Sequence, residues 1–269
     1  MKKNDMLTIV GFVIGVGLIV WAIVTGGSYA GFISPQSFAI TVGGSFAAIL
    51  ITYPMPQIKN MFKVIGQTFK ENSMSNTDII NNFTNLSRKA RREGLLSLED
   101  EINNIEDEFI KKGLQMVVDG IEPDVIKNIL ELEINEMDRR HEDSSNLLQT
   151  WGAYAPAFGM VGTLVGLIQM LANLSDASNL ASGMSTALVT TFYGSILANL
   201  ILIPLATNLK YKSGQEYANK EMILEGILAI QSGVNPRIVE EKLIAYLSPK
   251  EKVEFKNDSF EGNEVTENV

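Results

Sequence analysis

The chain has 269 residues, of which 46% are hydrophobic, and its formal net charge is −9. It contains no cysteine and one histidine, which excludes disulfides, thiolate metal sites and histidine-rich metal clusters. The acidic balance also excludes nucleic acid as a partner, because nucleic-acid-binding surfaces need clustered lysine and arginine. We therefore expect neither a cofactor nor a metal site, and we turn to where the charges lie.

Two long segments contain almost no ionisable side chain. Residues 6–58 have no Asp, Glu, Lys or Arg, and residues 144–209 have Asp176 as their single exception. Each segment is long enough for two membrane-spanning helices of about 20 residues. Each is also interrupted near its middle by turn-forming residues. The predicted spans lie near residues 6–25, 33–53, 151–173 and 184–208.

Two other interpretations of these apolar segments are open. A large soluble protein with buried helices is one, although charge-free segments of this length are hard to keep soluble. A cleaved signal peptide is the other, because Lys2 and Lys3 precede the first apolar run and residues 28–30 resemble a cleavage site. The run is longer than a usual signal core and a second span follows closely, so we expect it to be retained.

The lysines and arginines lie on one side of the predicted spans. All of them fall at residues 2–3, between 59 and 140, or between 210 and 256, and neither turn within a pair of spans contains one. The positive-inside rule then places both termini and the segment between the two pairs of spans in the cytoplasm.

The predicted fold is all-α, a polytopic membrane protein with four transmembrane helices and a helical cytoplasmic insert. In the insert, we expect one helix from 78 to 92 that ends at Gly94. Ser97 is the expected N-cap of a second helix that runs to Val118. A third helix is expected to start at Pro123 and to continue into the third span. The predicted parts are a first transmembrane hairpin (1–53), a cytoplasmic helical domain (54–150), a second transmembrane hairpin (151–208), C-terminal helices (209–248) and an acidic disordered tail (249–269).

The spans carry no ionisable side chain near their centres, so a carboxylate for ion transport has to come from another chain. Hydroxyls are present instead, at Thr163 near the middle of the third span and at Thr190 and Thr191 in the outer half of the fourth. Each can bond its own helix backbone, or the three can line a hydrated path. Pro156 and Pro204, towards the cytoplasmic ends of the same spans, are either packing kinks or hinges.

Two pairs of glycines have the four-residue spacing that lets helix backbones approach closely. They are Gly11 with Gly15 in the first span, and Gly162 with Gly166 in the third. The spacing fits packing within the subunit, and it also fits packing against another copy or a partner helix.

A dense group of charges surrounds the helix break at Gly94, from Arg88 to Glu101. Cations stabilise the end of one helix and acids the start of the next, which is sufficient reason for a solvated elbow. The same charges also suit an electrostatic docking site for a partner of complementary charge. The sequence leaves both interpretations open.

Three segments resemble the MotA family of flagellar stator subunits. Residues 155–167 (APAFGMVGTLVGL) resemble the third span of that family, and residues 187–194 (ALVTTFYG) with Ile203-Pro204 resemble its fourth. The elbow from Arg91 to Glu99 is similar to the family's rotor-contacting segment. The third-span signature is shared in weaker form by the ExbB and TolQ energisers, but those have three spans and lack the elbow.

The resemblance implies a non-enzymatic subunit of the bacterial inner membrane that couples inward ion flow to torque. It implies a homopentamer around a MotB-type single-span partner, which supplies the membrane aspartate, and contact with the rotor protein FliG. The implied residues are Thr191, Thr190 and Thr163 on the ion path, Pro156 and Pro204 in conformational coupling, and Arg91 or Arg92 with Glu99 at the rotor. We predict protons as the coupling ion. An ExbB- or TolQ-like energiser, a sodium-driven stator and a passive membrane scaffold are the alternatives.

Overall fold

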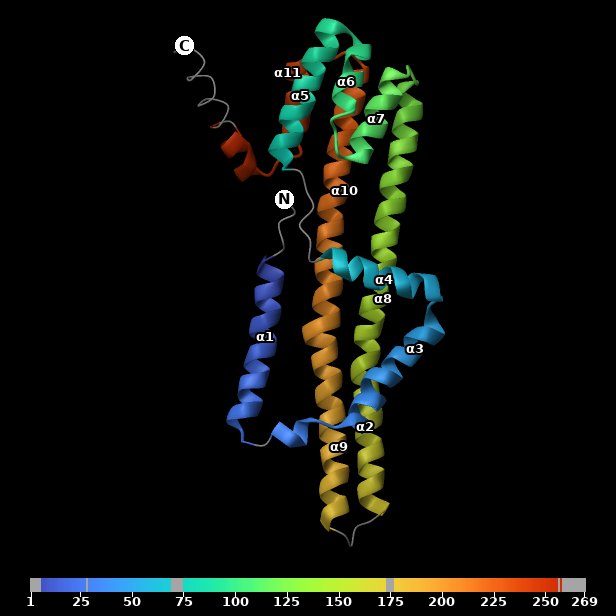
Figure 1. Ribbon diagram of the computed structural model, residues 1–269, viewed down its shortest axis with the longest axis vertical. Helices are drawn as coiled ribbons and strands as arrows, with labels where there is room; N and C mark the ends of the chain where they lie inside the picture. Colours follow the sequence, from blue (N-terminus) through green and yellow to red (C-terminus); the bar gives the residue numbers. More distant parts are fainter. Residues whose placement is uncertain (1–5, 28, 69–74, 173–176, 256, 258–269) are drawn as a thin grey trace. The chain divides into compact units, whose positions relative to one another are not determined.

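The computed structural model describes residues 6–27, 29–68, 75–172, 177–255 and 257 (Figure 1). Every regular element in these residues is a helix. Four helical segments are long and apolar enough to cross a membrane: Thr8–Thr25, Tyr29–Thr52, Pro123–Ala172 and Ser178–Gln231. The predicted all-α fold with four spans is confirmed.

The chain divides into two compact units. Unit 1 comprises residues 1–72 and 139–213, and unit 2 comprises residues 73–138 and 214–269. The predicted domain boundaries at 53, 150 and 208 follow the ends of the expected spans and stay a prediction. Residues outside those spans, including Ile58, Met61 and Leu209, belong to the core of unit 1.

The first half of unit 1 contains two spans and a transverse helix. Helix α1 (Met6–Thr25) is followed by a short 3-10 turn, η1 (Tyr29–Phe32). The second span is built from α2 (Pro35–Phe38), the π-helical segment η2 (Ala39–Gly43) and α3 (Gly44–Thr52). Helix α4 (Met55–Thr68) then turns aside and runs across α8 (Figure 1).

The second half of unit 1 contains the other two spans. They are formed by α8 (Pro123–Ala172) and by α9 (Ala177–Ile196), the π-helical segment η4 (Leu197–Leu202) and α10 (Ile203–Gln231). The prediction that the helix from Pro123 runs without a break into the third span is confirmed. The unit's core joins α3, α4, α8, η4 and α10, and it includes Ile49, Met61, Leu147, Leu148, Ala198 and Leu202.

Unit 2 is a helical cluster with its own apolar core. Helix α5 (Asn76–Glu93) ends at Gly94, whose φ of 89° is a conformation that favours glycine. It is followed by η3 (Leu95–Leu98), α6 (Glu99–Ile102) and α7 (Glu108–Val118), and later by α11 (Pro236–Ile244). The core includes Ile80, Phe83, Leu98, Leu114, Ile126 and Ile227.

The prediction of one helix from Ser97 to Val118 is wrong. The Ser97 hydroxyl donates to the Gly94 carbonyl at 2.7 Å instead of capping a helix, and α6 ends after one turn at Ile102. The Asp107 carboxylate accepts from two backbone N–H groups, at 2.9 and 3.0 Å, and so caps a separate helix. A side chain that satisfies two free helical donors sets the helix start more firmly than Ser97 does.

The predicted disordered tail does not begin at 249. Residues 249–255 are helical, and Phe255 is buried in the core of unit 2. The Glu251 carboxylate accepts from the Ser248 backbone N–H at 2.9 Å and from the Asn76 amide at 3.3 Å. An apolar anchor and a capped helix start therefore order this segment despite its charge. Residues 256 and 258–269 lie outside the described residues.

Candidate functional site

The hydroxyls of Thr163 and Thr191 lie 2.6 Å apart where α8 meets α9. The Ala187 carbonyl oxygen lies 3.0 Å from the first hydroxyl and 3.3 Å from the second. The Gly159 carbonyl oxygen is 3.1 Å from Thr163. Four oxygens thus share the two protons that the hydroxyls can donate, which leaves acceptor capacity for a water molecule or a cation. Over the described residues, no group of three or more His, Asp or Glu is placed to hold a metal ion.

Thr190 has a different environment from its neighbour Thr191. It is fully buried, and its hydroxyl donates to carbonyls of its own helix, with Thr186 at 2.9 Å and Ala187 at 3.0 Å. Thr191 is exposed in the single chain. Of the three threonines predicted as a group, two meet at the surface and Thr190 takes part in packing.

Glycines permit the close contact between α8 and α9. A Cβ built on Gly166 would lie 2.5 Å from the Gly183 carbonyl oxygen and 2.7 Å from the Ala187 nitrogen. A Cβ on Gly162 would lie 2.4 Å from Thr190 Cγ2. Since these are distances that side chains do not reach, this glycine pair packs within the subunit, the first of the two interpretations.

The two glycines of the first span, Gly11 and Gly15, have different surroundings. A Cβ on Gly15 would lie 2.6 Å from Leu200 Cδ1, so this residue packs α1 against the π segment η4. A Cβ built on Gly11 would have no heavy atom within 4 Å, apart from the neighbouring backbone of its own helix. Only one of the two glycines is therefore used for packing inside this chain.

A row of exposed polar side chains continues from Thr191 along the fourth span. Ser195, Asn199 and Thr207 are exposed at intervals of four or eight residues. In an α-helix, side chains four residues apart lie slightly further around the helix axis at each step. The π segment within the row turns less per residue, and this offsets the rotation. Because intramembrane polar groups seldom face lipid, this surface suits water or a partner helix. Sequence reasoning missed Ser195 and Asn199, although their spacing from Thr191 was the available signal.

The two intramembrane prolines lie on adjacent helices. Pro156 is inside α8, and a Cβ on Gly194 of the fourth span would lie 3.1 Å from its Cα. Pro204 is the second residue of α10, which follows η4. At the end of η4 the Ile203 N–H donates to the Ala198 carbonyl, five residues back. Ile203 packs on Gly152, so the prolines lie about one helical turn apart in depth.

The second span also contributes polar groups, which sequence reasoning missed. The Thr41 hydroxyl donates to the Thr190 carbonyl at 3.2 Å, and the Trp151 indole donates to the Ser45 hydroxyl at 3.1 Å. The Tyr193 hydroxyl donates to the Phe32 carbonyl. These bonds fix the second span against the helices that carry the threonine pair. Thr41 and Ser45 lie four residues apart, which is the pattern that marks a common helix face.

The charged residues of the elbow that were predicted to contact the rotor differ in whether they form an ion pair. Arg92 lies 3.7 Å from the Glu93 carboxylate. Arg91 and Glu99 are exposed, and neither side chain has a partner among the described residues. The Leu96 side chain between them is 71% exposed, an apolar feature of this surface that the charge pattern did not indicate.

A salt bridge closes the elbow. The Lys89 ammonium donates to the Glu101 carboxylate at 2.8 Å and so joins the end of α5 to α6. This hydrogen bond raises the pKa of Lys89 above its ordinary value. Both residues lie within two positions of the exposed Arg91 and Glu99, so the bridge sets the spacing of those free charges.

Two protein-family models and several known proteins match this chain. Residues 101–222 match the model of the MotA/TolQ/ExbB proton channel family, and residues 9–94 match that of the motility protein A N-terminal region. Motility protein A of Treponema pallidum is 43% identical over 93% of this chain and 97% of its own length. Motility protein A of Borreliella burgdorferi is 44% identical over 96% and 99%. The flagellar MotAB stator complex from Bacillus subtilis contains a chain with a TM-score of 0.86 and 32% identity, over 93% of this chain and 99% of that one.

Proposed function

The chain belongs to the motility protein A group of the MotA/TolQ/ExbB proton channel family, and from this we propose that it is the MotA-type subunit of a flagellar stator. It is a multi-pass membrane protein that works with a MotB-type subunit. Its function is ion transport coupled to motility, not covalent catalysis.

The observation that carries this function is the oxygen cluster at Thr163 and Thr191. It lies at the surface of spans that contain no carboxylate near their centres. A proton or cation that crosses the membrane here needs a titrating group from elsewhere. A single-span partner with a membrane aspartate, packed on this surface, supplies that group. The threonine hydroxyls then solvate the ion as it reaches and leaves the aspartate.

We propose that the ion path continues along the fourth span. Ser195 and Asn199 extend the exposed polar row from Thr191 towards Pro204. Pro156 and Pro204 each remove one backbone N–H from a helix next to this row. In this proposal the helix bends at these points when the partner aspartate gains or loses its proton. Positive-inside charge supports an orientation with both termini in the cytoplasm.

The assembly that fits these surfaces is a homopentamer around the MotB-type partner. Four apolar side chains form an exposed line along the α8 span, at the spacing of one helix face. They are Met160, Leu164, Ile168 and Leu171. An apolar line beside the polar row suits packing against neighbouring copies and the partner helix. At the elbow we propose contact with FliG through Arg91 and Glu99, whose charges are unpaired among the described residues, unlike Arg92.

Reversing the salt bridge at the elbow tests its positioning role. Lys89→Glu and Glu101→Lys are each expected to lower torque, because either change opens the link between α5 and α6. The loss should be partial, since an ion pair near the surface contributes little to stability. The double change Lys89→Glu with Glu101→Lys restores the pair and should restore most of the torque, measured from tethered-cell rotation at equal membrane levels. A double variant as weak as the single ones would mean that these side chains contact the rotor themselves.

Deletion of the gene tests the function itself. Swimming should be lost and nutrient uptake should be unchanged, whereas an ExbB- or TolQ-like energiser would give the reverse.

Vesicles with the chain and its partner should show ion flux, which a passive scaffold would lack. Swimming speed measured against external sodium at fixed pH should stay constant if protons drive the motor, and a rise with sodium would assign a sodium-driven stator.

A further inference from the structure

The transverse helix α4 has the composition of a helix at a membrane surface. Its buried face packs into the core of unit 1 through Ile58, Met61 and Val64. Its other faces present Lys59 and Lys63, both exposed, and Phe62, which is 53% exposed. Lysines that flank an exposed aromatic side chain direct their ammonium groups to headgroups while the ring contacts acyl chains.

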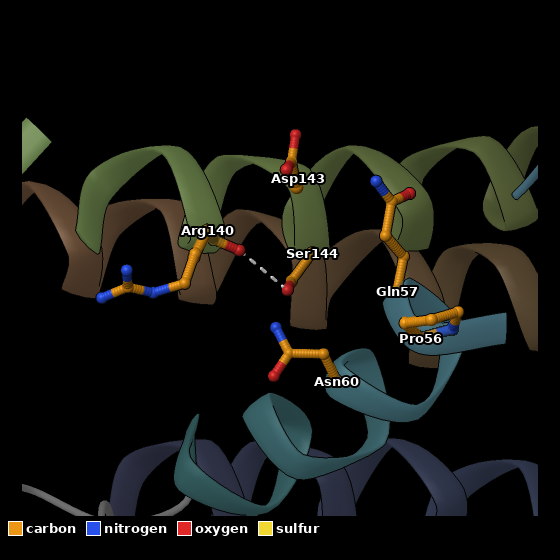
Figure 2. Close-up of a pocket in the computed structure, with 6 residues that line it drawn as sticks. All are labelled: Pro56, Gln57, Asn60, Arg140, Asp143 and Ser144. Carbon is orange, nitrogen blue, oxygen red and sulfur yellow. Dashed lines mark hydrogen bonds between the residues drawn. The ribbon is translucent and has the colours of Figure 1, made fainter. Parts of the chain in front are cut away.

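A cavity of about 190 Å³ opens between α4 and α8 (Figure 2). Its lining residues are Pro56, Gln57, Asn60, Arg140, Asp143 and Ser144. The cavity therefore combines one guanidinium group with two side-chain amides, which together supply hydrogen-bond donors from two helices.

The amide and guanidinium side chains of this cavity are not buried and have no partner among the described residues. Over the described ranges, the side chains of Gln57, Asn60 and Arg140 have neither a hydrogen bond nor an ion pair. The Ser144 hydroxyl donates to the Arg140 carbonyl at 2.9 Å. In Figure 2, Asn60 points towards Ser144, and the Asp143 carboxylate points away from α4. The acid in the lining is thus turned from the Asn60 amide in this view, and the arginine has no ion pair among the described residues.

Lysines and arginines outnumber acids in the segments of unit 1 next to the spans, although the chain as a whole is acidic. The segments of unit 1 next to the spans (54–66, 139–150 and 203–213) contain six cationic residues and two acidic ones. The cations are Lys59, Lys63, Arg139, Arg140, Lys210 and Lys212, and the acids are Glu142 and Asp143. A basic rim at the ends of membrane helices attracts the anionic lipids of the cytoplasmic leaflet.

We propose that this cavity binds the phosphate of an anionic phospholipid headgroup. Arg140 is the principal ligand, because a guanidinium donates two parallel hydrogen bonds to phosphate oxygens. The Asn60 amide adds a donor from α4. The bound lipid ties α4 to α8 at the level where the spans enter the bilayer. This inference rests on the proposed orientation, which puts the rim at the cytoplasmic leaflet.

Lipid titration of the full-length chain, purified with the subunits that accompany it, tests the site. The protein is placed in nanodiscs of phosphatidylcholine with increasing phosphatidylglycerol, and its thermal unfolding midpoint is recorded. Phosphatidylglycerol should raise the midpoint in a saturable way. Arg140→Gln should weaken the apparent affinity about tenfold, as expected for the loss of a charged hydrogen bond. Arg140→Lys should lie between the two, since it keeps the charge and loses the paired geometry.

Lys59→Gln is the matched control, because it removes a nearby cation that does not line the cavity. Equal losses from Lys59→Gln and Arg140→Gln, or equal midpoints in the two lipids, would overturn the proposal. The same rise with inorganic phosphate in pure phosphatidylcholine would also overturn it and indicate a soluble anion. A chain that supports swimming but fails this test contradicts the lipid site alone. A chain that binds phosphatidylglycerol but leaves deleted cells immotile contradicts the stator function alone.

Discussion

Thr191→Val is expected to reduce ion flux and swimming about tenfold or more, whereas Thr190→Val should have a much smaller effect. Valine keeps the shape of threonine and removes only the hydroxyl. The Thr191 hydroxyl is exposed and lies 2.6 Å from that of Thr163. An ion at this point loses an oxygen ligand, and a hydrogen bond to a charged group is worth about 1.5–3 kcal/mol. Each 1.4 kcal/mol corresponds to about a factor of ten.

The pair of valine variants contains its own control. Thr190 is fully buried, and its hydroxyl bonds only carbonyls of its own helix, so its loss affects packing and not the path. Flux is measured with a pH-sensitive dye in vesicles that contain the chain and its partner at matched levels. Equal losses in the two variants would mean that the hydroxyls act in packing. Unchanged flux in Thr191→Val would remove this residue from the path.

Gly166→Ala is expected to destabilise the chain by about 1–3 kcal/mol, because the added methyl overpacks the contact between α8 and α9. The Cβ would meet backbone atoms of Gly183 and Ala187 at 2.5 and 2.7 Å, and backbone cannot rotate aside as a side-chain end can. A valine at this position should prevent accumulation altogether. The larger displacement would also separate Thr163 from Thr191.

Gly11→Ala provides the comparison, since a Cβ there meets nothing within 4 Å. Both variants are followed by thermal unfolding of the purified chain and by its amount in the membrane. Gly11→Ala should match the unchanged chain within error. If Gly166→Ala were equally stable, α8 and α9 would pack less closely than this geometry requires.

The spans were predictable because one physical requirement dominates their sequence. Charged groups are costly in hydrocarbon, so the charge-free segments outline the membrane helices with little influence from tertiary context. The end of α5 was also predictable, since Gly94 adopts a φ of 89° that other residues rarely adopt. Both features depend on local chemistry alone.

Features that depend on competing local choices were not predictable. Ser97 and Asp107 are both good caps, and only the fold decides that Asp107 caps α7 while Ser97 bonds backward to Gly94. The buried role of Thr190 and the exposed role of Thr191 differ by one position on a helix. That distinction needs the position of α8, which the order of residues does not contain.

The π segment η4 has a consequence for how this protein tolerates change. The segment lies between Thr191 and Pro204, and each of its turns contains more residues than a turn of an α-helix. Removing one residue from this six-residue segment would let an ordinary α-helix form and would leave the downstream helix in nearly its present orientation, because six π-helical residues turn about as far as five α-helical ones. Thr207 would then stay on the face that Thr191 occupies. A deletion in a regular α-helical part of the same span has no extra residue to absorb it, and it would rotate everything that follows by about 100° around the helix axis.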